Sequence, residues 1–272
     1  MRFPELLAAI AIAGTLALPA SAAPEDVRAS IAAALRERLP HMTPQDYPLG
    51  AAAFDTELRR AREDNAGAGA EVLAAGKALW TRKFKNGRTL SGCFPNGGRR
   101  IAAAYPQFDP RVKRVITLEM AINQCLKAHG EALFDHGDAA TMGAVMAYLR
   151  SLANGQKLAV RVPPAAQERF EQGRRLYFTR LGQRNYACAS CHVQAAGKRY
   201  EDAPLSPAMG QAVHWPAIRK GTALTLQESM RECLERMGAA PFPAGSEELN
   251  NIEYFLTYLS NGYAIQANAW RP

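Results

Sequence analysis

The chain carries one arrangement of residues twice. Around two of its cysteines, Cys125 and Cys233, ten-residue segments share Thr, Leu, Cys and Leu at the same offsets, and a glycine follows each at the same distance. Two further blocks match in the same order, one upstream and one downstream. The matching blocks are 76–80, 117–126 and 148–155 in the first copy and 173–177, 225–234 and 258–262 in the second. This shared order indicates an internal duplication, so the sequence predicts two homologous halves of roughly 100 residues each.

Apolar residues at helical spacing predict three helices in each half. The second copy opens with a start signal at 163–164, Pro-Pro, and its last helix opens with Ser246 followed by two glutamates. No segment alternates convincingly enough for a strand, and no hairpin is expected. The predicted helices are 68–83, 116–128 and 139–153, and then 165–180, 224–237 and 246–260.

Residues 188–192 read Cys-Ala-Ser-Cys-His, the C-x-x-C-H attachment sequence of c-type haem. In such a motif both thiols form thioether bonds with the haem vinyl groups, and His192 is an axial iron ligand through a ring nitrogen. A zinc site would need a second C-x-x-C, and a thioredoxin-like redox pair would need a preceding βαβ pattern; neither is present. The sequence therefore predicts one haem c bound covalently through Cys188 and Cys191.

The first half has lost this motif. When Cys93 is aligned with the second cysteine of the motif, Leu90 stands in place of the first cysteine and Phe94 in place of the histidine. The first half is therefore not expected to bind haem covalently. Cys93 and Cys125 would then lie where the haem edge and the distal ligand once met. A disulfide between them is predicted, with two free thiols as the alternative.

A helix, a haem motif and a closing helix make up the plan of a small all-α cytochrome c. The predicted fold class is all-α, with two tandem cytochrome-c-like domains of which only the second carries haem. The expected divisions are a signal peptide at 1–22, a helical extension at 23–67, a domain without haem at 68–160 and the haem-binding domain at 161–272.

The N-terminus indicates export from the cytoplasm. Arg2 precedes an apolar run over 6–18, and Ala-Ser-Ala at 20–22 fits an A-x-A cleavage pattern. The run is too short to span a bilayer, and an apolar first helix of the folded domain is the alternative. Export places the mature chain in an oxidising compartment, so a periplasmic protein with no membrane-spanning part is predicted.

The formal net charge is +8, which suits acidic partner proteins or anionic substrates, or serves solubility alone. Nucleic acid is not an expected partner, because the basic residues are scattered without aromatic residues between them and the compartment is wrong.

Cys233 remains without a partner, 42 residues after Cys191. Small cytochromes c usually supply their distal axial ligand near this point, and a thiolate there would hold ferric iron and lower its potential. Methionine is the commoner distal ligand. The residues that compete with Cys233 for this role are Met209, Met230, Met237 and His214.

Further motifs surround these residues. The second half contains His-Trp-Pro-x-x-Arg at 214–219. It also contains a helical segment that begins with Leu-Gln and includes Cys233, followed by Pro-Phe at 241–242. The first half contains Ala-Tyr-Pro-x-Phe-Asp at 104–109 and Ile-Asn-x-Cys at 122–125. Together they resemble the SoxA family, the larger subunit of the SoxAX cytochrome of bacterial thiosulfate oxidation. The resemblance covers nearly the whole mature chain and is to the single-haem type, in which a disulfide stands at the lost haem site.

The resemblance implies an L-cysteine S-thiosulfotransferase, a transferase of sulfur-containing groups coupled to cytochrome c reduction. Cys233 would be both the distal haem ligand and the catalytic residue, often found as a persulfide. It would join thiosulfate to a cysteine of the SoxYZ carrier protein in a two-electron oxidation. Electrons would leave through the haem to the SoxX cytochrome, the partner in a heterodimer, and on to an acceptor cytochrome. A cytochrome acting only in electron transfer and a non-catalytic docking scaffold are the alternatives.

One position departs from the family pattern. The family usually has an arginine one helical turn before the catalytic cysteine, and here that residue is Ser229. Arg236, Arg231 and Arg219 are the candidate substrate-binding residues. On an ideal helix Arg231 points away from Cys233, whereas Arg236 three residues on shares its face. Surface solvation is the alternative role for all three arginines.

Overall fold

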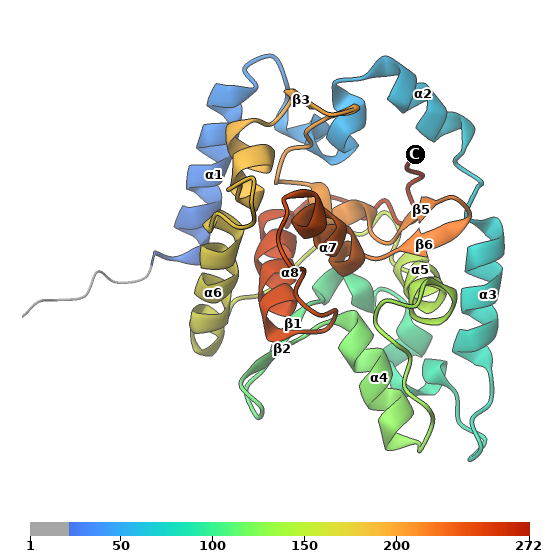
Figure 1. Cartoon of the computed structure of the whole chain (residues 1–272). Helices are drawn as coiled ribbons and strands as arrows, with labels where there is room; N and C mark the ends of the chain where they lie inside the picture. The colour runs from blue at the N-terminus through green and yellow to red at the C-terminus, as the bar shows by residue number, and fades with distance from the viewer. Residues whose placement is uncertain (1–21) are drawn as a thin grey trace, which may run out of the picture.

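The computed structural model describes residues 22–272 as a mostly helical molecule (Figure 1). The predicted signal peptide falls almost entirely on residues 1–21, outside the described part. Both halves contain their predicted helices, and a π-helical turn at Ala139–Gly143 leads into α5. These helices are α3 (Ala70–Thr81), α4 (Leu118–Ala128) and α5 (Ala144–Ser151), then α6 (Gln167–Phe178), α7 (Leu226–Arg236) and α8 (Glu247–Leu259). Within 22–272, no helix has both the length and the hydropathy that crossing a membrane requires.

The repeated threonine and glycine mark the two ends of the same helix in each half. Thr117 Oγ1 accepts a hydrogen bond of 3.3 Å from the backbone N–H three residues on, at the start of α4. Thr225 Oγ1 accepts the equivalent bond of 3.2 Å at the start of α7. Beyond the other end, Gly130 and Gly238 have φ of 70° and 71°, the left-handed conformation that commonly ends helices and favours glycine. The duplicated residues are therefore the caps of α4 and α7.

A second duplicated feature is the close crossing of the first and last helices of each half. α3 packs on α5 and α6 packs on α8. A Cβ atom at Gly76 would collide with the Ala144 carbonyl oxygen, and one at Gly173 would collide with the Asn251 carbonyl oxygen. Only glycine lets the two backbones approach this closely, so the same residue is required at the same crossing in both halves.

We expect Gly173→Ala to lower the free energy of unfolding by about 1–3 kcal/mol, the usual cost of overpacking, despite the higher helix propensity of alanine. Chemical denaturation followed by far-UV circular dichroism measures the change. Gly67→Ala is the matched control, because no atom lies within 4 Å of the Cβ position there. Equal unfolding midpoints for the two variants would contradict the helix-crossing role.

The structure corrects the expectation that hairpins are absent. Two antiparallel hairpins lie at equivalent places, directly before α4 and α7, with Phe108 opposite Val115 in the first and Ile218 opposite Ala223 in the second. Each strand has two or three residues, which is too short for an alternating pattern to show in sequence. The pairs are β1 (Gln107–Asp109) with β2 (Arg114–Ile116), β3 (Arg199–Tyr200) with β4 (Ala203–Pro204), and β5 (Ala217–Arg219) with β6 (Thr222–Leu224).

The N-terminal extension packs on the second half. Its helices are α1 (Pro24–Arg38), a 3₁₀ segment (Pro44–Ala53) and α2 (Thr56–Asp64). α1 packs against the π-helical turn at Ser190–Gln194 and buries Val27, Ile31 and Leu35 in the same core as α6 and α8. Arg28 Nη2 also donates to Asn261 O just after α8, at 2.7 Å. The first segment after the predicted cleavage site is thereby fixed to the half that carries the C-x-x-C-H motif.

Candidate haem and sulfur site

A cavity opens in the second half, with an empty volume of ≈1390 Å³ that includes its open mouth. Cys188, Cys191 and His192 line it, and Cys233 lines it from α7. The structure therefore brings the motif and the distant cysteine to one space. Most of the remaining lining is apolar. It includes Leu176, Leu181, Leu226, Leu249, Ile252 and Leu256.

The orientation of His192 suits iron ligation. It lies in the π-helical turn Ser190–Gln194. Its Nδ1 is 2.8 Å from Ser206 O, and since a carbonyl can only accept, Nδ1 carries the proton and donates. Nε2 is then the nitrogen with a free lone pair, and a carbonyl partner on Nδ1 is the usual outer support of a ligating histidine. Burial lowers the pKa of His192 and favours the neutral imidazole, the form that binds metal.

Cys233 lies on α7 with a positive charge beside its sulfur. Arg236 Nη2 donates to Cys233 Sγ at 3.3 Å, as expected for residues three apart on a helix. Burial, and then the nearby Cys233 sulfur, raises the pKa of Cys188 to about 12. Cys188, Cys191 and Cys233 are all free thiols. The cavity is apolar, and it offers two thiols, a histidine Nε2 and a further sulfur. These groups fit haem c.

The competing distal ligands divide into two groups. Met230 and Met237 line the cavity, on either side of Cys233 along α7. Met209 is buried in the core at 4% exposure, and it does not line the cavity. His214 is also buried away from the cavity, beside Gly50 of the N-terminal extension, and burial lowers its pKa. Of the five candidate distal ligands, the three that line the cavity and could face a haem are Cys233, Met230 and Met237.

The three candidate arginines are not equivalent. Arg236 lines the cavity and contacts the Cys233 sulfur. Arg231 instead forms an ion pair with Glu228 at 2.9 Å, and Arg219 forms a bidentate pair with Glu232. Neither Arg231 nor Arg219 belongs to the cavity lining.

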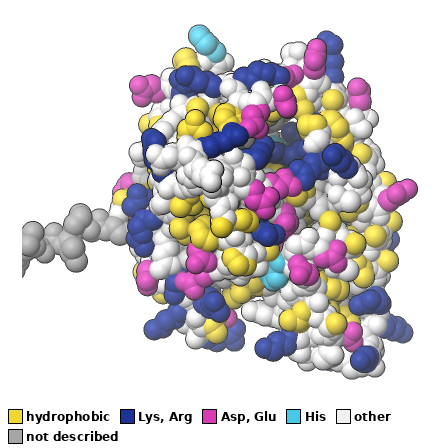
Figure 2. Space-filling view, viewed as in Figure 1, with side chains coloured by type: hydrophobic (Ala, Val, Ile, Leu, Met, Phe, Trp, Pro, Cys, Tyr) yellow, Lys and Arg dark blue, Asp and Glu magenta, His cyan; other side chains and the backbone are white. Residues whose placement is uncertain are grey.

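A further arginine, Arg271, lines the cavity and was missed by the sequence reasoning. Its place next to last in the chain gives no local signal, because the approach depends wholly on tertiary structure. Figure 2 shows basic side chains gathered around a hollow near the C-terminal end of the chain and α7.

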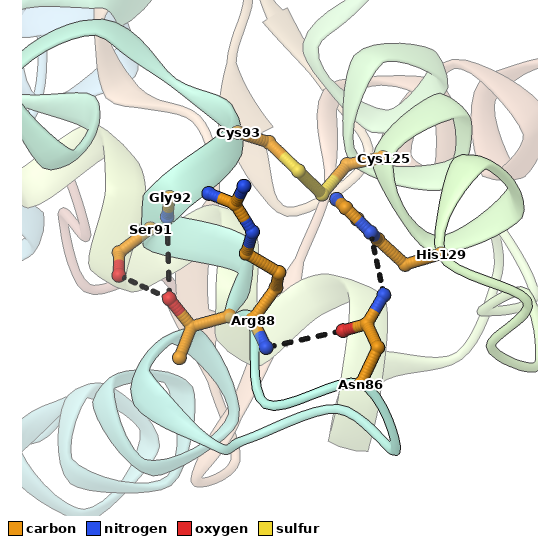
Figure 3. The surroundings of a disulfide bond; sticks show 8 residues. Asn86, Arg88, Ser91, Gly92, Cys93, Cys125 and His129 are labelled. Atoms are coloured by element: carbon orange, nitrogen blue, oxygen red, sulfur yellow. Dashed lines mark hydrogen bonds between the residues drawn. A yellow bond between two sulfur atoms is a disulfide. The ribbon is translucent and has the colours of Figure 1, made fainter.

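In the first half, Cys93 and Cys125 form a disulfide, with their Cα atoms 6.0 Å apart (Figure 3). This is the predicted pairing. His129 lies beside the disulfide, and its Nδ1 accepts a hydrogen bond of 2.9 Å from Asn86 Nδ2. Although these two cysteines and His129 are close enough to surround a metal ion, the sulfurs are bonded to each other and offer no thiolate.

Apolar side chains fill the first half at the positions that correspond to the haem motif. Leu90, which aligns with Cys188, is 1% exposed, and Phe94, which aligns with His192, is also buried. The Phe94 ring packs against Trp80 with ring centroids 5.2 Å apart. Both belong to the core that α3, α4 and α5 share. The two halves therefore have one plan, with a packed core in the first and an open cavity in the second.

Comparison with known proteins agrees with this duplication. The model of the family described as SoxA/TsdA, cytochrome c domain, matches residues 75–158 and again residues 172–265. An L-cysteine S-thiosulfotransferase subunit SoxA from Allochromatium vinosum is 36% identical over 270 residues, covering 96% of this chain and 95% of the relative. The protein of the same name from Chlorobaculum thiosulfatiphilum is 40% identical, covering 73% and 70%. The crystal structure of SoxXA from P. pantotrophus shares the fold, with a TM-score of 0.73, 23% identity and coverage of 80% of this chain and 84% of that one.

Proposed function

Because this chain belongs to the SoxA/TsdA cytochrome c family, we propose that it is an L-cysteine S-thiosulfotransferase subunit of the SoxA type. The observation that carries the proposal is the meeting of Cys233 with the C-x-x-C-H residues at one cavity. A cysteine that faces a haem site and has an arginine at its sulfur is suited to sulfur chemistry coupled to electron removal.

We propose that the second half holds one haem c and the first half holds none. Cys188 and Cys191 would form the thioether bonds, with His192 Nε2 and Cys233 Sγ as the axial ligands. When bound, the haem supplies a one-electron acceptor next to the Cys233 sulfur. The orientation of His192 toward Ser206 supports the proximal role, and the buried Leu90 and Phe94 support the absence of a first haem.

In the proposed reaction, the Cys233 sulfur bonds to the outer sulfur of thiosulfate. The thiosulfate group is then transferred to a cysteine of the carrier. Formation of the Cys233 S–S bond from two thiolates releases two electrons, which leave for cytochrome acceptors. The carrier cysteine thiolate then attacks the sulfur derived from thiosulfate, a new S–S bond forms on the carrier, and the Cys233 thiolate is released. Arg236 lies where it stabilises the negative charge on Cys233 at both stages.

The partners follow from this reaction. We propose a heterodimer with a SoxX-type cytochrome, a SoxYZ-type carrier as the acceptor of thiosulfate, and a cytochrome that removes the electrons. The proposed location is the periplasm, reached through a signal peptide at 1–22, where haem c and disulfides are both stable. The proposed domains are 23–67, 68–160 and 161–272; the family matches at 75–158 and 172–265 support the last two.

The function is tested by mixing the holoprotein and its SoxX partner with reduced SoxYZ, thiosulfate and an excess of oxidised cytochrome c. We expect the carrier subunit to gain the mass of one thiosulfonate group, with two cytochromes reduced per carrier modified. Met230 and Met237 also face the cavity, which favours a plain electron carrier as the second candidate. Cytochrome reduction without any change in carrier mass would support that second candidate and overturn the transferase.

A further inference from the structure

The C-terminal segment brings one residue, Arg271, to the cavity wall. Residue 270 pairs with Ile218 of β5 as a parallel β-bridge. Ile218 N donates to Ala269 O at 3.0 Å, and Arg271 N donates to Ile218 O at 2.8 Å. These bonds fix the backbone on both sides of the bridge, and the side chain of Arg271 consequently lines the cavity.

The guanidinium of Arg271 is stacked rather than paired. Its Cζ lies 4.3 Å from the ring centroid of Trp215, which also lines the cavity. Within residues 22–272, no side-chain hydrogen bond or ion pair involves this guanidinium. The neighbouring basic groups have such partners: Arg219 pairs with Glu232, and Arg62 donates to Gln266.

Arg271 lies close enough to Cys233 for the two groups to interact electrostatically. Burial, and then the nearby Arg62 charge, lowers the pKa of Arg271 itself to about 10, while the Cys233 sulfur acts in the opposite direction. At neutral pH the guanidinium is still charged. Arg271 is half-buried, and its five N–H donors have no acceptor in the described part of the protein, so the guanidinium is free to donate to an oxyanion in the cavity.

α7 supplies few other cations to the cavity. Arg236 is occupied by the Cys233 sulfur, Arg231 by Glu228, and position 229 is a serine on the cavity wall. We propose that Arg271, held on Trp215, is the oxyanion-binding residue of this cavity. Resting on the proposed function, the oxyanion is either a carboxylate of the bound haem or the sulfonate end of thiosulfate.

The test compares Arg271→Gln with the control Arg111→Gln in the full-length holoprotein. Arg111 is an exposed arginine, ion-paired with Asp109 away from the cavity, so the control removes the same charge elsewhere. Two quantities are measured on each variant: the midpoint potential of the haem by spectroelectrochemistry, and the dissociation constant of thiosulfate with the ferric protein by calorimetry.

If Arg271 binds the thiosulfate sulfonate, its loss raises the dissociation constant of thiosulfate at least about tenfold, as for other charge-assisted hydrogen bonds. If it binds a haem carboxylate, its loss lowers the midpoint potential below that of the control, because the extra electron of ferrous haem loses a nearby cation, while thiosulfate affinity is kept. If both quantities match those of Arg111→Gln, the proposal is wrong.

Arg271→Lys covers the case in which Arg271→Gln does not fold. Lysine keeps the charge but loses the planar fork and its stacking on Trp215, so the same quantity should shift in the same direction by a smaller amount. The proposal would also be wrong if Arg271→Lys had the same midpoint potential and the same thiosulfate dissociation constant as Arg111→Gln. Neither measurement requires carrier modification, so a failure of the transferase assay is distinguishable from a failure of Arg271 to bind the oxyanion.

Discussion

Cys233→Ala is expected to reduce transfer of thiosulfate to the carrier by at least about 10³-fold, because it removes the side chain that we propose forms the intermediate S–S bond. Haem attachment should survive, since Cys188, Cys191 and His192 are unchanged. The carrier-mass assay measures transfer, and the mass of the intact variant measures haem content. Electron paramagnetic resonance of the ferric protein should also change, from a low-spin thiolate signal to that of another ligand or of high-spin iron.

Glu235→Ala is the matched control for this variant. Glu235 lies two residues away on α7 and is exposed, so its replacement tests the general effect of mutating this helix. The control should keep both transfer and the thiolate signal. Transfer at the wild-type rate by Cys233→Ala would exclude Cys233 as the catalytic residue. An absorption band typical of methionine ligation in the wild type would instead place Met230 or Met237 on the iron.

Removal of the disulfide should have the largest effect on stability. The double variant Cys93→Ala/Cys125→Ala opens a loop with a sequence separation of 32 residues, and the chain-entropy relation gives a loss of about 3–4 kcal/mol in the free energy of unfolding. Urea denaturation of the oxidised wild type and the variant measures this difference. Carrier transfer by the folded variant should be retained, since the disulfide lies in the other half.

Reduction of the wild-type protein provides the control for this effect. If the loss comes from the cross-link, the reduced wild type should unfold at nearly the same urea concentration as the double variant. A loss below about 1 kcal/mol would mean that the packing of Leu90, Phe94 and Trp80 holds this half without the cross-link.

Much of the fold was predictable because its signals are local. Thr117 and Thr225 cap helices through contacts three residues away, and the glycines beyond α4 and α7 end them. The disulfide was predictable from the alignment of Cys93 with the haem motif. The hairpins were not, because β5 and β6 have three residues each and are defined by pairing rather than by pattern.

The site was predictable only in part, for the same reason. Met209 and Met230 are equally plausible distal ligands in the sequence, and only the tertiary structure separates the buried core from the cavity wall. The ion pair of Arg219 with Glu232 joins β5 to α7 and likewise depends on tertiary structure. The pair of Arg231 with Glu228 is local, three residues apart on α7, and agrees with the expectation that Arg231 points away from Cys233.

The packing of Leu90 and Phe94 has an evolutionary consequence. To bind haem through the same motif, the first half would need a cysteine at 90 and a histidine at 94, and both disulfide sulfurs would have to be free. Truncating Leu90 alone would leave a void in the core that it shares with Trp80, at a cost of about 2 kcal/mol or more. Breaking the disulfide alone would cost more still. Every single step toward a haem motif in the first half therefore passes through a less stable protein, so the packed core itself opposes haem binding there.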